Sequence, residues 1–282
     1  QTKKLNNLFT FIESIEDLAF LNQELLTKPY VGVDTEFRRT TKDNMKLALL
    51  QVNDGDEIYL IDSIAISDPK DDASFLFSES VIKIFHSCKE DLEAIYAWTN
   101  QEMINIFDTQ VANAFLESDY SIGYQGLVEK RLGIALDKKE TRSNWIRRPL
   151  TDAQLKYAAL DVEYLIHLYE EQKEQLLKSS KLNWLNQDVE RLISNTFSEF
   201  SPFNDLERTL TKAQEAEILN KLDNIVKEIA GHEKINTTLF FSKKAQKDFL
   251  RLVLAEGLDS ACDEITFWRK KLIKEPMSNL LR

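Results

Sequence analysis

The sequence is poor in the residues that mark chain turns. Its 282 residues include only seven Gly and five Pro, which argues against a turn-rich all-β protein and against a chain dominated by linkers. All apolar runs are far shorter than the ~18 residues of a membrane span, so no membrane association is expected. The segment Gln1–Phe11 lacks an apolar core and a small-residue cleavage site, so we expect no secretory signal.

Cysteine and histidine are equally scarce, with two Cys and three His in the chain. With so few of these residues, spread widely along the chain, we expect no structural zinc site built from Cys and His alone. One disulfide between Cys88 and Cys262 is the alternative to two free thiols. Nothing in the sequence indicates an oxidising compartment, so we expect a reduced, cytoplasmic protein.

Positive charge is in the minority, with 36 Lys and Arg against 47 Asp and Glu and a net charge of −11. This balance argues against general binding of phosphate backbones, which depends on clustered Lys and Arg. Residues 128–148 differ, because they contain seven basic and three acidic residues. Both a solvated helix face and a local contact with nucleic acid are consistent with this stretch.

Hydrophobic residues make up 43% of the chain, enough for a buried core. The length suits two domains. After a helix that begins near Ser14, the first part reads as strands followed by alternating strands and helices, and it ends with one long helix from Thr151 to about Leu177. The expected early strands are Tyr30–Phe37, Leu47–Val52 and Glu57–Asp62. Beyond residue 206 only helical periodicity is found, including one helix over Leu258–Lys271, so we predict an α/β domain with a mixed sheet and a small all-α domain.

The triplet Asp34-Thr35-Glu36 lies at the charged end of the first of these strands. Residues two apart on a strand share a face, so both carboxylates point the same way. Such a pair suits Mg²⁺ or Mn²⁺, which prefer oxygen ligands. Similar acidic triplets occur by chance elsewhere, but Asp34 follows apolar residues, where an ionised carboxylate is costly unless it is paired or metal-bound. The chance triplets are Asp54/Asp56, Asp91/Glu93, Asp161/Glu163 and Glu215/Glu217.

Two other segments are candidates for the same chemistry. Tyr157 and Asp161 are four apart on the long helix and therefore lie on one face of it; a core tyrosine bonded to a helix aspartate explains them equally well. Asp91 lies in the helix that follows His86 and Ser87, where it could belong to a solvated first turn with Ser87 as the cap. His86 is expected to be structural.

Taken together, these segments resemble the tyrosine-containing branch of the DEDD (DnaQ-like) superfamily of 3′→5′ exonucleases, and specifically ribonuclease D. The matching stretches are VDTEF at 33–37, FHSCKEDLEAI at 85–95 and SNWIRRPLTDAQLKYAALDVEYL at 143–165, with a weaker match at YLIDS, 59–63. The resemblance covers most of residues 10–178. It implies a ribonuclease H-like mixed sheet flanked by helices and a 3′→5′ exonuclease domain at 1–178. A helical connector at 179–205 and an HRDC-like helical domain at 206–282 would follow, shorter than the two such modules typical of the family.

The resemblance also implies roles for residues. Asp34, Glu36, Asp91 and Asp161 would hold two Mg²⁺ or Mn²⁺ ions, and Tyr157 would orient the attacking water. Single nucleoside 5′-monophosphates would be released from RNA with a free single-stranded 3′ end, such as tRNA precursors, by a monomeric enzyme. The candidate substrate contacts are Thr35, Phe37, Arg142, Trp145, Arg147 and Arg148. A DNA exonuclease of the same fold and a catalytically silent nucleic-acid-binding module are the alternatives.

Overall fold

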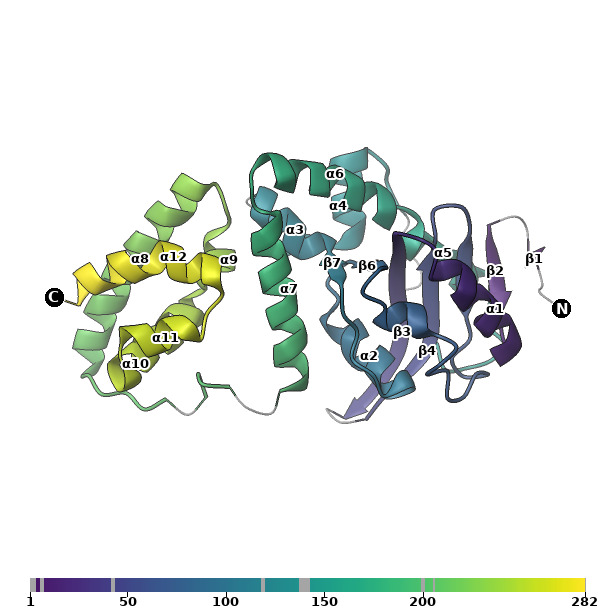
Figure 1. Ribbon diagram of the computed structural model, residues 1–282, viewed down its shortest axis with the longest axis horizontal. Coiled ribbons are helices and arrows are strands. Elements are labelled where there is room, and N and C mark those ends of the chain that lie inside the picture. The colour runs from purple at the N-terminus through teal and green to yellow at the C-terminus, as the bar shows by residue number, and fades with distance from the viewer. Residues whose placement is uncertain are drawn as a thin grey trace. The chain divides into compact units, whose positions relative to one another are not determined.

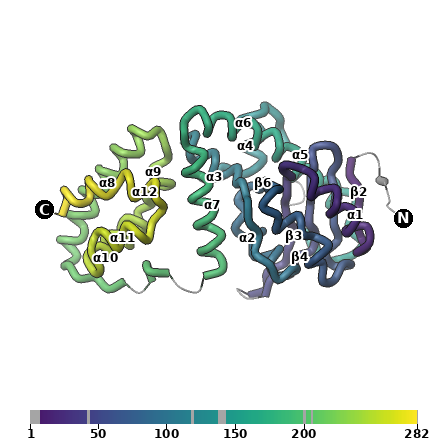
Figure 2. Tube along the Cα trace, in the orientation of Figure 1, coloured from purple at the N-terminus to yellow at the C-terminus, as the bar shows by residue number. Residues whose placement is uncertain are grey.

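The computed structural model describes residues 4–5, 8–41, 44–117, 120–136, 143–198, 201–204 and 206–281, with only the backbone described at 4–5. The chain forms two compact units (Figures 1 and 2). The first comprises residues 1–110 and 122–174, and the second comprises residues 111–121 and 175–282. No helix in the described part of the chain is both long and apolar enough to cross a membrane.

The first unit is built on one sheet, which in the described residues has the strand order β1-β2-β5-β4-β3-β6-β7. The pairs β1–β2, β3–β4 and β4–β5 are antiparallel, whereas β2–β5, β3–β6 and β6–β7 are parallel. The predicted mixed sheet is therefore confirmed. The strands are β1 Lys4–Leu5, β2 Phe9–Ile12, β3 Tyr30–Thr41, β4 Asn44–Asn53, β5 Ile58–Ile61, β6 Ile82–Phe85 and β7 Ile106–Asp108.

The central strands owe their positions to their apolar residues. Every residue of β4 from Leu47 to Asn53 is buried, as are Val31 and Val33 of β3. Such continuous burial is expected of strands covered on both faces. Strand β2 was not predicted from the sequence.

Helices flank this sheet, and their ends follow local sequence signals. Ser14 begins α1 as predicted, because its Oγ accepts the backbone N–H of Asp17 at 3.2 Å. Thr151 and Gln154 form a reciprocal capping box at the start of α5. The helical segments up to residue 178 are α1 Ile15–Leu25, the 3₁₀ turn η1 Ser74–Phe77, α2 Lys89–Thr99, α3 Thr109–Leu116, α4 Tyr124–Leu132, α5 Asp152–Glu163 and α6 Leu165–Lys178.

The predicted single helix from Thr151 to Leu177 is wrong at one point, since it breaks at Tyr164 into α5 and α6. The cause is a hydroxyl group from elsewhere in the chain. The Tyr164 N–H donates to the Tyr124 hydroxyl at 3.1 Å, and that hydroxyl donates to the Leu160 carbonyl at 3.0 Å. A side chain inserted between these backbone groups replaces the helical bond and kinks the helix.

The second unit is helical in its described part, as predicted. Its core contains Trp268, which stacks on Trp184 with ring centroids 4.9 Å apart and is held by its indole N–H on Asp188 at 2.8 Å. The expected helix over 258–271 is instead two helices separated at residues 264–266. The helices that follow α6 are α7 Leu182–Phe197, α8 Lys212–Glu233, α9 Thr237–Phe241, α10 Lys243–Glu256, α11 Leu258–Asp263 and α12 Phe267–Leu280.

Candidate active site

The two carboxylates of β3 lie where this strand loses a neighbour. β3 pairs with β6 only over residues 30–32, so the stretch from Val33 onward has no strand on that side. Asp34 and Glu36 share one face of β3. Thr35 points to the opposite face, where its hydroxyl donates to Asp91 Oδ1 of α2 at 2.5 Å. The open edge thus allows Asp91 to approach β3.

Asp91 is buried in the first turn of α2, and another carboxylate fixes the loop before it. Asp108 accepts the backbone N–H groups of Ser87 at 3.1 Å and Cys88 at 2.8 Å. Ser87 therefore does not cap α2 as expected, since Cys88 occupies the cap position and no side chain caps the helix there. The backbone of Ser87 is left-handed, with φ of 65°.

Tyr157 and Asp161 belong to α5, which lies directly on β3 and β4. The Asn53 side chain of β4 donates to the carbonyls of Val162 at 3.0 Å and Glu163 at 3.2 Å. Gly32 of β3 permits close approach, because a Cβ there would lie only 3.1 Å from Cβ of Leu165. The Tyr157 hydroxyl and the Asp161 carboxylate interact across this helical turn, and the interaction lowers the pKa of Asp161.

These carboxylates interact electrostatically, which shows that the fold brings the three segments together. Burial raises the pKa of Asp34 well above its usual range, and the charges of Asp91, Asp161 and Glu36 raise it further. Burial followed by the charges of Asp161 and Asp91 raises the pKa of Glu36 to about 9. Burial raises the pKa of Asp91 and of Asp161 to about 7 each, against the hydroxyl groups of Thr35 and Tyr157 that lower them. Several buried acids repelling one another are the setting in which a cation stabilises the ionised forms.

The donor set suits a hard divalent cation, because four carboxylates supply only oxygen ligands. The side chains are not, however, already gathered around one point: no three His, Cys, Asp or Glu side chains among the described residues are placed to hold a metal ion together. Asp91 accepts a hydrogen bond from the Thr35 hydroxyl through Oδ1, and the Asp161 carboxylate interacts with the Tyr157 hydroxyl.

The predicted substrate contacts divide into two groups. Arg148 is occupied within the fold, since its guanidinium donates to Asp62, Ala48 and Trp145. Trp145 is only 5% exposed and its ring lies 6.1 Å from that of Tyr157. Thr35 is also buried, and is bonded to Asp91. All three side chains are therefore engaged inside the fold, which does not favour them as substrate contacts.

Two of the remaining candidates reach the surface, since Phe37 is half-buried and Arg147 exposed. Arg142 lies outside the described residues. His86 is held inside the fold at both ring nitrogens, by Thr109 Oγ1 at 2.9 Å and by the Ile122 carbonyl at 3.0 Å. Its environment is that of the structural histidine expected from the sequence.

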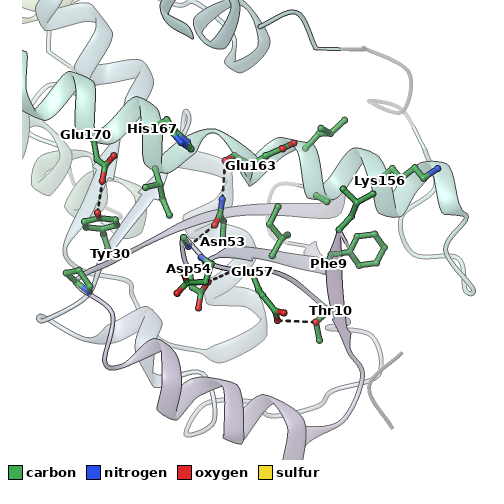
Figure 3. A pocket seen from close by; sticks show the side chains of 18 residues that line it. Phe9, Thr10, Tyr30, Asn53, Asp54, Glu57, Lys156, Glu163, His167 and Glu170 are labelled. Atoms are coloured by element: carbon green, nitrogen blue, oxygen red, sulfur yellow. Dashed lines mark hydrogen bonds between the residues drawn. The ribbon is translucent and has the colours of Figure 1, made fainter. Parts of the chain in front are cut away.

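A cavity of about 1040 Å³ is formed by α5, α6 and the turn between β4 and β5, but it contains none of the five predicted catalytic residues (Figure 3). The α5 residues that line it include Lys156 and Glu163. Around it Tyr30 donates to Glu170 at 2.7 Å and Thr10 to Glu57 at 3.5 Å. Its carboxylates are thus separate from those of the candidate site.

Comparison with known proteins identifies the family. A family model described as a 3′-5′ exonuclease matches residues 9–177, more than half of the chain. The chain belongs to this 3′-5′ exonuclease family. Its Asp34, Glu36, Asp91, Tyr157 and Asp161 all lie inside the matched region.

Curated relatives of this exonuclease domain are named ribonuclease D. One from Shewanella sp. (strain ANA-3) is 38% identical over 192 residues, which are 68% of this chain and 50% of the relative. One from Pseudomonas paraeruginosa (strain PA7) is 40% identical over 194 residues, 68% of this chain and 51% of the relative. The alignments thus span about half the length of these relatives.

Solved structures show the same exonuclease fold. Escherichia coli RNase D, described as an exoribonuclease involved in structured RNA processing, matches 97% of this chain and 73% of its own, with TM-score 0.66 and 25% identity. NrnC of Brucella melitensis, solved with bound Mg²⁺, matches 62% of this chain and 87% of its own, with TM-score 0.54 and 23% identity. The predicted ribonuclease H-like (DnaQ-like) fold class is confirmed.

Proposed function

We propose that this protein is a metal-dependent 3′→5′ exoribonuclease of the ribonuclease D type. It would trim the 3′ ends of tRNA precursors and other small RNAs and release nucleoside 5′-monophosphates. The observation that carries the proposal is the electrostatic coupling of Asp34, Glu36, Asp91 and Asp161 beside Tyr157, inside an exonuclease domain. The curated relatives named ribonuclease D favour RNA as the substrate.

Each residue has a role in this proposal. Asp34, Glu36, Asp91 and Asp161 would together hold the two Mg²⁺ or Mn²⁺ ions. The ions would supply charge neutralisation at the scissile phosphate and a more acidic water. Tyr157 would hold that water by its hydroxyl. Burial and the charges of Asp161 and Glu36 raise the pKa of Tyr157, so the phenol stays protonated at neutral pH and acts as a hydrogen-bond group rather than as a base.

The helical segment 206–282 would act as an HRDC-like module, joined to the exonuclease domain by the connector 179–205, and would help to grip structured RNA. We propose that the enzyme is a cytoplasmic monomer. The two cysteines favour a reducing compartment, because Cys88 and Cys262 are both buried and free. A DNA exonuclease of the same fold is the second candidate. It is favoured only by the fact that no described residue is identified as a contact for the 2′-hydroxyl group of RNA.

The test uses a 5′-labelled single strand, as RNA and as DNA, with Mg²⁺ and with chelator. A metal-dependent ladder of one-nucleotide steps on RNA, much weaker on DNA, is expected. Stronger cleavage of DNA would favour the second candidate. Binding without a ladder on either strand would favour a silent binding module.

Two variants and one control assign the residues. Asp34→Asn should lower turnover by about 10³-fold or more, and Tyr157→Phe by about 10²-fold with RNA binding retained. Asp56→Asn is the matched control, because it also changes a member of an acidic triplet, but one in an exposed turn. Wild-type turnover in Asp34→Asn would refute the metal assignment.

A further inference from the structure

Beyond the two carboxylates, the same face of β3 carries a cation. Arg38 follows Glu36 by two residues and therefore points to the face that bears Asp34 and Glu36. Its side chain is exposed and forms no hydrogen bond or ion pair with any described residue. Arg39, on the opposite face, is by contrast paired with Glu93 of α2 and lies 3.8 Å from Glu90.

The strand register places a second cation directly opposite the first. Arg38 pairs with Lys46 of β4, and residues directly opposite each other in an antiparallel pair lie on one face with their Cβ atoms about 5 Å apart. Lys46 is also exposed, and none of the described side chains forms an ion pair with it. Two unpaired cations thus stand side by side on the face of the catalytic carboxylates.

These cations lie on a two-stranded arm. β4 pairs with β5 only over Leu50–Asn53, and β3 pairs with β6 only over Tyr30–Gly32. Within the part of the chain that the structure describes, the stretch of β3 and β4 that carries Arg38 and Lys46 therefore has no neighbouring strand on either side, and Figure 1 shows the two strands running out together. Arg38 and Lys46 are both exposed on this arm.

The pair is not explained by the stability of the fold. Like charges directly opposite each other destabilise an antiparallel pair. No carboxylate among the described residues forms an ion pair with either of them. An anion that binds both would relieve their repulsion, and in a chain of net charge −11 a local positive site is needed to hold a polyanion near acidic residues.

We propose that Arg38 and Lys46 form a binding site for backbone phosphates of the single-stranded RNA, on the 5′ side of the nucleotide that is removed. This inference rests on the proposed function. Arg38 lies about 7 Å along β3 from Glu36, so a strand whose 3′ end is at the carboxylates passes the pair within its last few nucleotides. Arg38 offers a fork that fits two phosphate oxygens, and Lys46 offers a point charge.

The test compares Arg38→Gln, Lys46→Gln and the double variant with wild type on unstructured RNA, from a dinucleotide to strands of several nucleotides. The double variant should raise KM for the long strands about tenfold at low salt and leave kcat within about twofold, because two exposed charge contacts are lost. The dinucleotide, too short to reach the pair, should keep its KM. Lys70→Gln is the matched control, since it removes an exposed charge from the loop after β5.

Equilibrium binding provides an independent readout. The affinity of the long strand, measured by fluorescence anisotropy in chelator, should depend less on salt in the double variant, with a slope smaller by about 1.4 for two lost phosphate contacts. Thermal stability should be unchanged or higher, because a repulsive pair is removed. If wild type binds RNA but does not degrade it, the proposed function fails while this titration still tests the site.

Three outcomes would overturn the proposal. The double variant could behave like Lys70→Gln at every strand length and salt concentration. It could lose stability together with affinity, with no rescue by the charge-conserving Arg38→Lys. Inorganic phosphate, added as a second probe, could displace the long strand from wild type at concentrations too low to change the ionic strength appreciably. That result would assign the site to free phosphate.

Discussion

Arg148 and Asp62 form a two-point ion pair in which Nε and Nη2 of the arginine donate to the two carboxylate oxygens at 2.7 and 2.6 Å. The same guanidinium donates to the carbonyls of Trp145 at 2.6 Å and Ala48 at 2.7 Å. One side chain thereby ties the segment before α5 to the middle of β4 and to the residue that follows β5. Trp145 of that segment packs against the ring of Tyr157, so the pair indirectly holds the tyrosine in place.

Arg148→Ala should therefore lower the free energy of unfolding by about 3 kcal/mol, because it leaves the charge of Asp62 buried without a partner. Turnover should fall as Tyr157 loses its support, while KM for RNA changes little. Denaturant unfolding and steady-state kinetics measure the two effects. Arg148→Lys should recover only part of the stability, since one ammonium group cannot make the same set of bonds. An increase in KM without loss of stability would instead indicate a phosphate contact.

The Tyr124 hydroxyl, which separates α5 from α6, binds the backbone next to Asp161. It accepts the N–H of Tyr164 and donates to the carbonyl of Leu160, the residue directly before Asp161. Tyr124→Phe should remove both bonds, cost about 1–2 kcal/mol of stability and lower turnover through the displaced carboxylate. In this variant, the rate of hydrogen exchange at the Tyr164 amide shows whether that N–H forms a helical hydrogen bond with the Leu160 carbonyl. Tyr164→Phe is the matched control, since it removes a nearby hydroxyl that interacts with the Glu163 side chain. Equal turnover in the two variants would separate the helix break from catalysis.

Lys83 of β6 is fully buried, with its Nζ donating to the carbonyls of Ser78 at 2.8 Å and Val81 at 2.9 Å. Burial lowers the pKa of Lys83 to about 7, well below that of an unfolded chain. Between about pH 7 and pH 10 the unfolded chain thus binds more protons than the folded one, so the destabilising contribution is complete at and below pH 7 and fades as the pH rises.

The expected result is a pH-dependent difference between wild type and Lys83→Met. From pH 7 upward, the free energy of unfolding of wild type should rise relative to that of the variant by up to about 1.4 kcal/mol per pH unit. Only this slope is diagnostic, since the variant also loses two hydrogen bonds at every pH. Denaturant unfolding at several pH values measures it, with Lys70→Met as the exposed control. Parallel curves for wild type and Lys83→Met would show that Lys83 keeps its ordinary pKa.

Prediction from the sequence succeeded where the signal was local or where motifs were long. The Ser14 cap, the antiparallel strands of the early sheet and the all-helical second part follow from short patterns. The exonuclease family was recognised from the resemblance at residues 33–37, 85–95 and 143–165. The roles of Asp34, Glu36, Asp91, Tyr157 and Asp161 came with that resemblance and stay predictions for the assays above.

The features that were missed depend on partners far along the chain. Strand β2 has only four residues, and its parallel partner β5 lies far along the chain, with Thr10 opposite Tyr59. The break at Tyr164 is caused by a tyrosine 40 residues earlier, and the partner of Arg148 lies 86 residues before it. The sequence places Arg38 and Lys46 on the two strands of one hairpin. Whether they share a face depends on the register between β3 and β4, which periodicity alone does not give.

That register turns on a single residue. Glu36 pairs with Leu49 and Phe37 with Leu47, so Ala48 is an insertion in β4. In a regular ladder without this bulge, Ala48 would pair with Phe37, Leu47 would stand opposite Arg38, and Lys46 would stand opposite Arg39 on the side covered by Glu90 and Glu93. The bulge thus keeps the charge of Lys46 on the same face as Arg38, with no substitution at all. The presence of this one extra residue in β4 therefore matters for the charge of that face as much as the identity of the residues that the two strands carry.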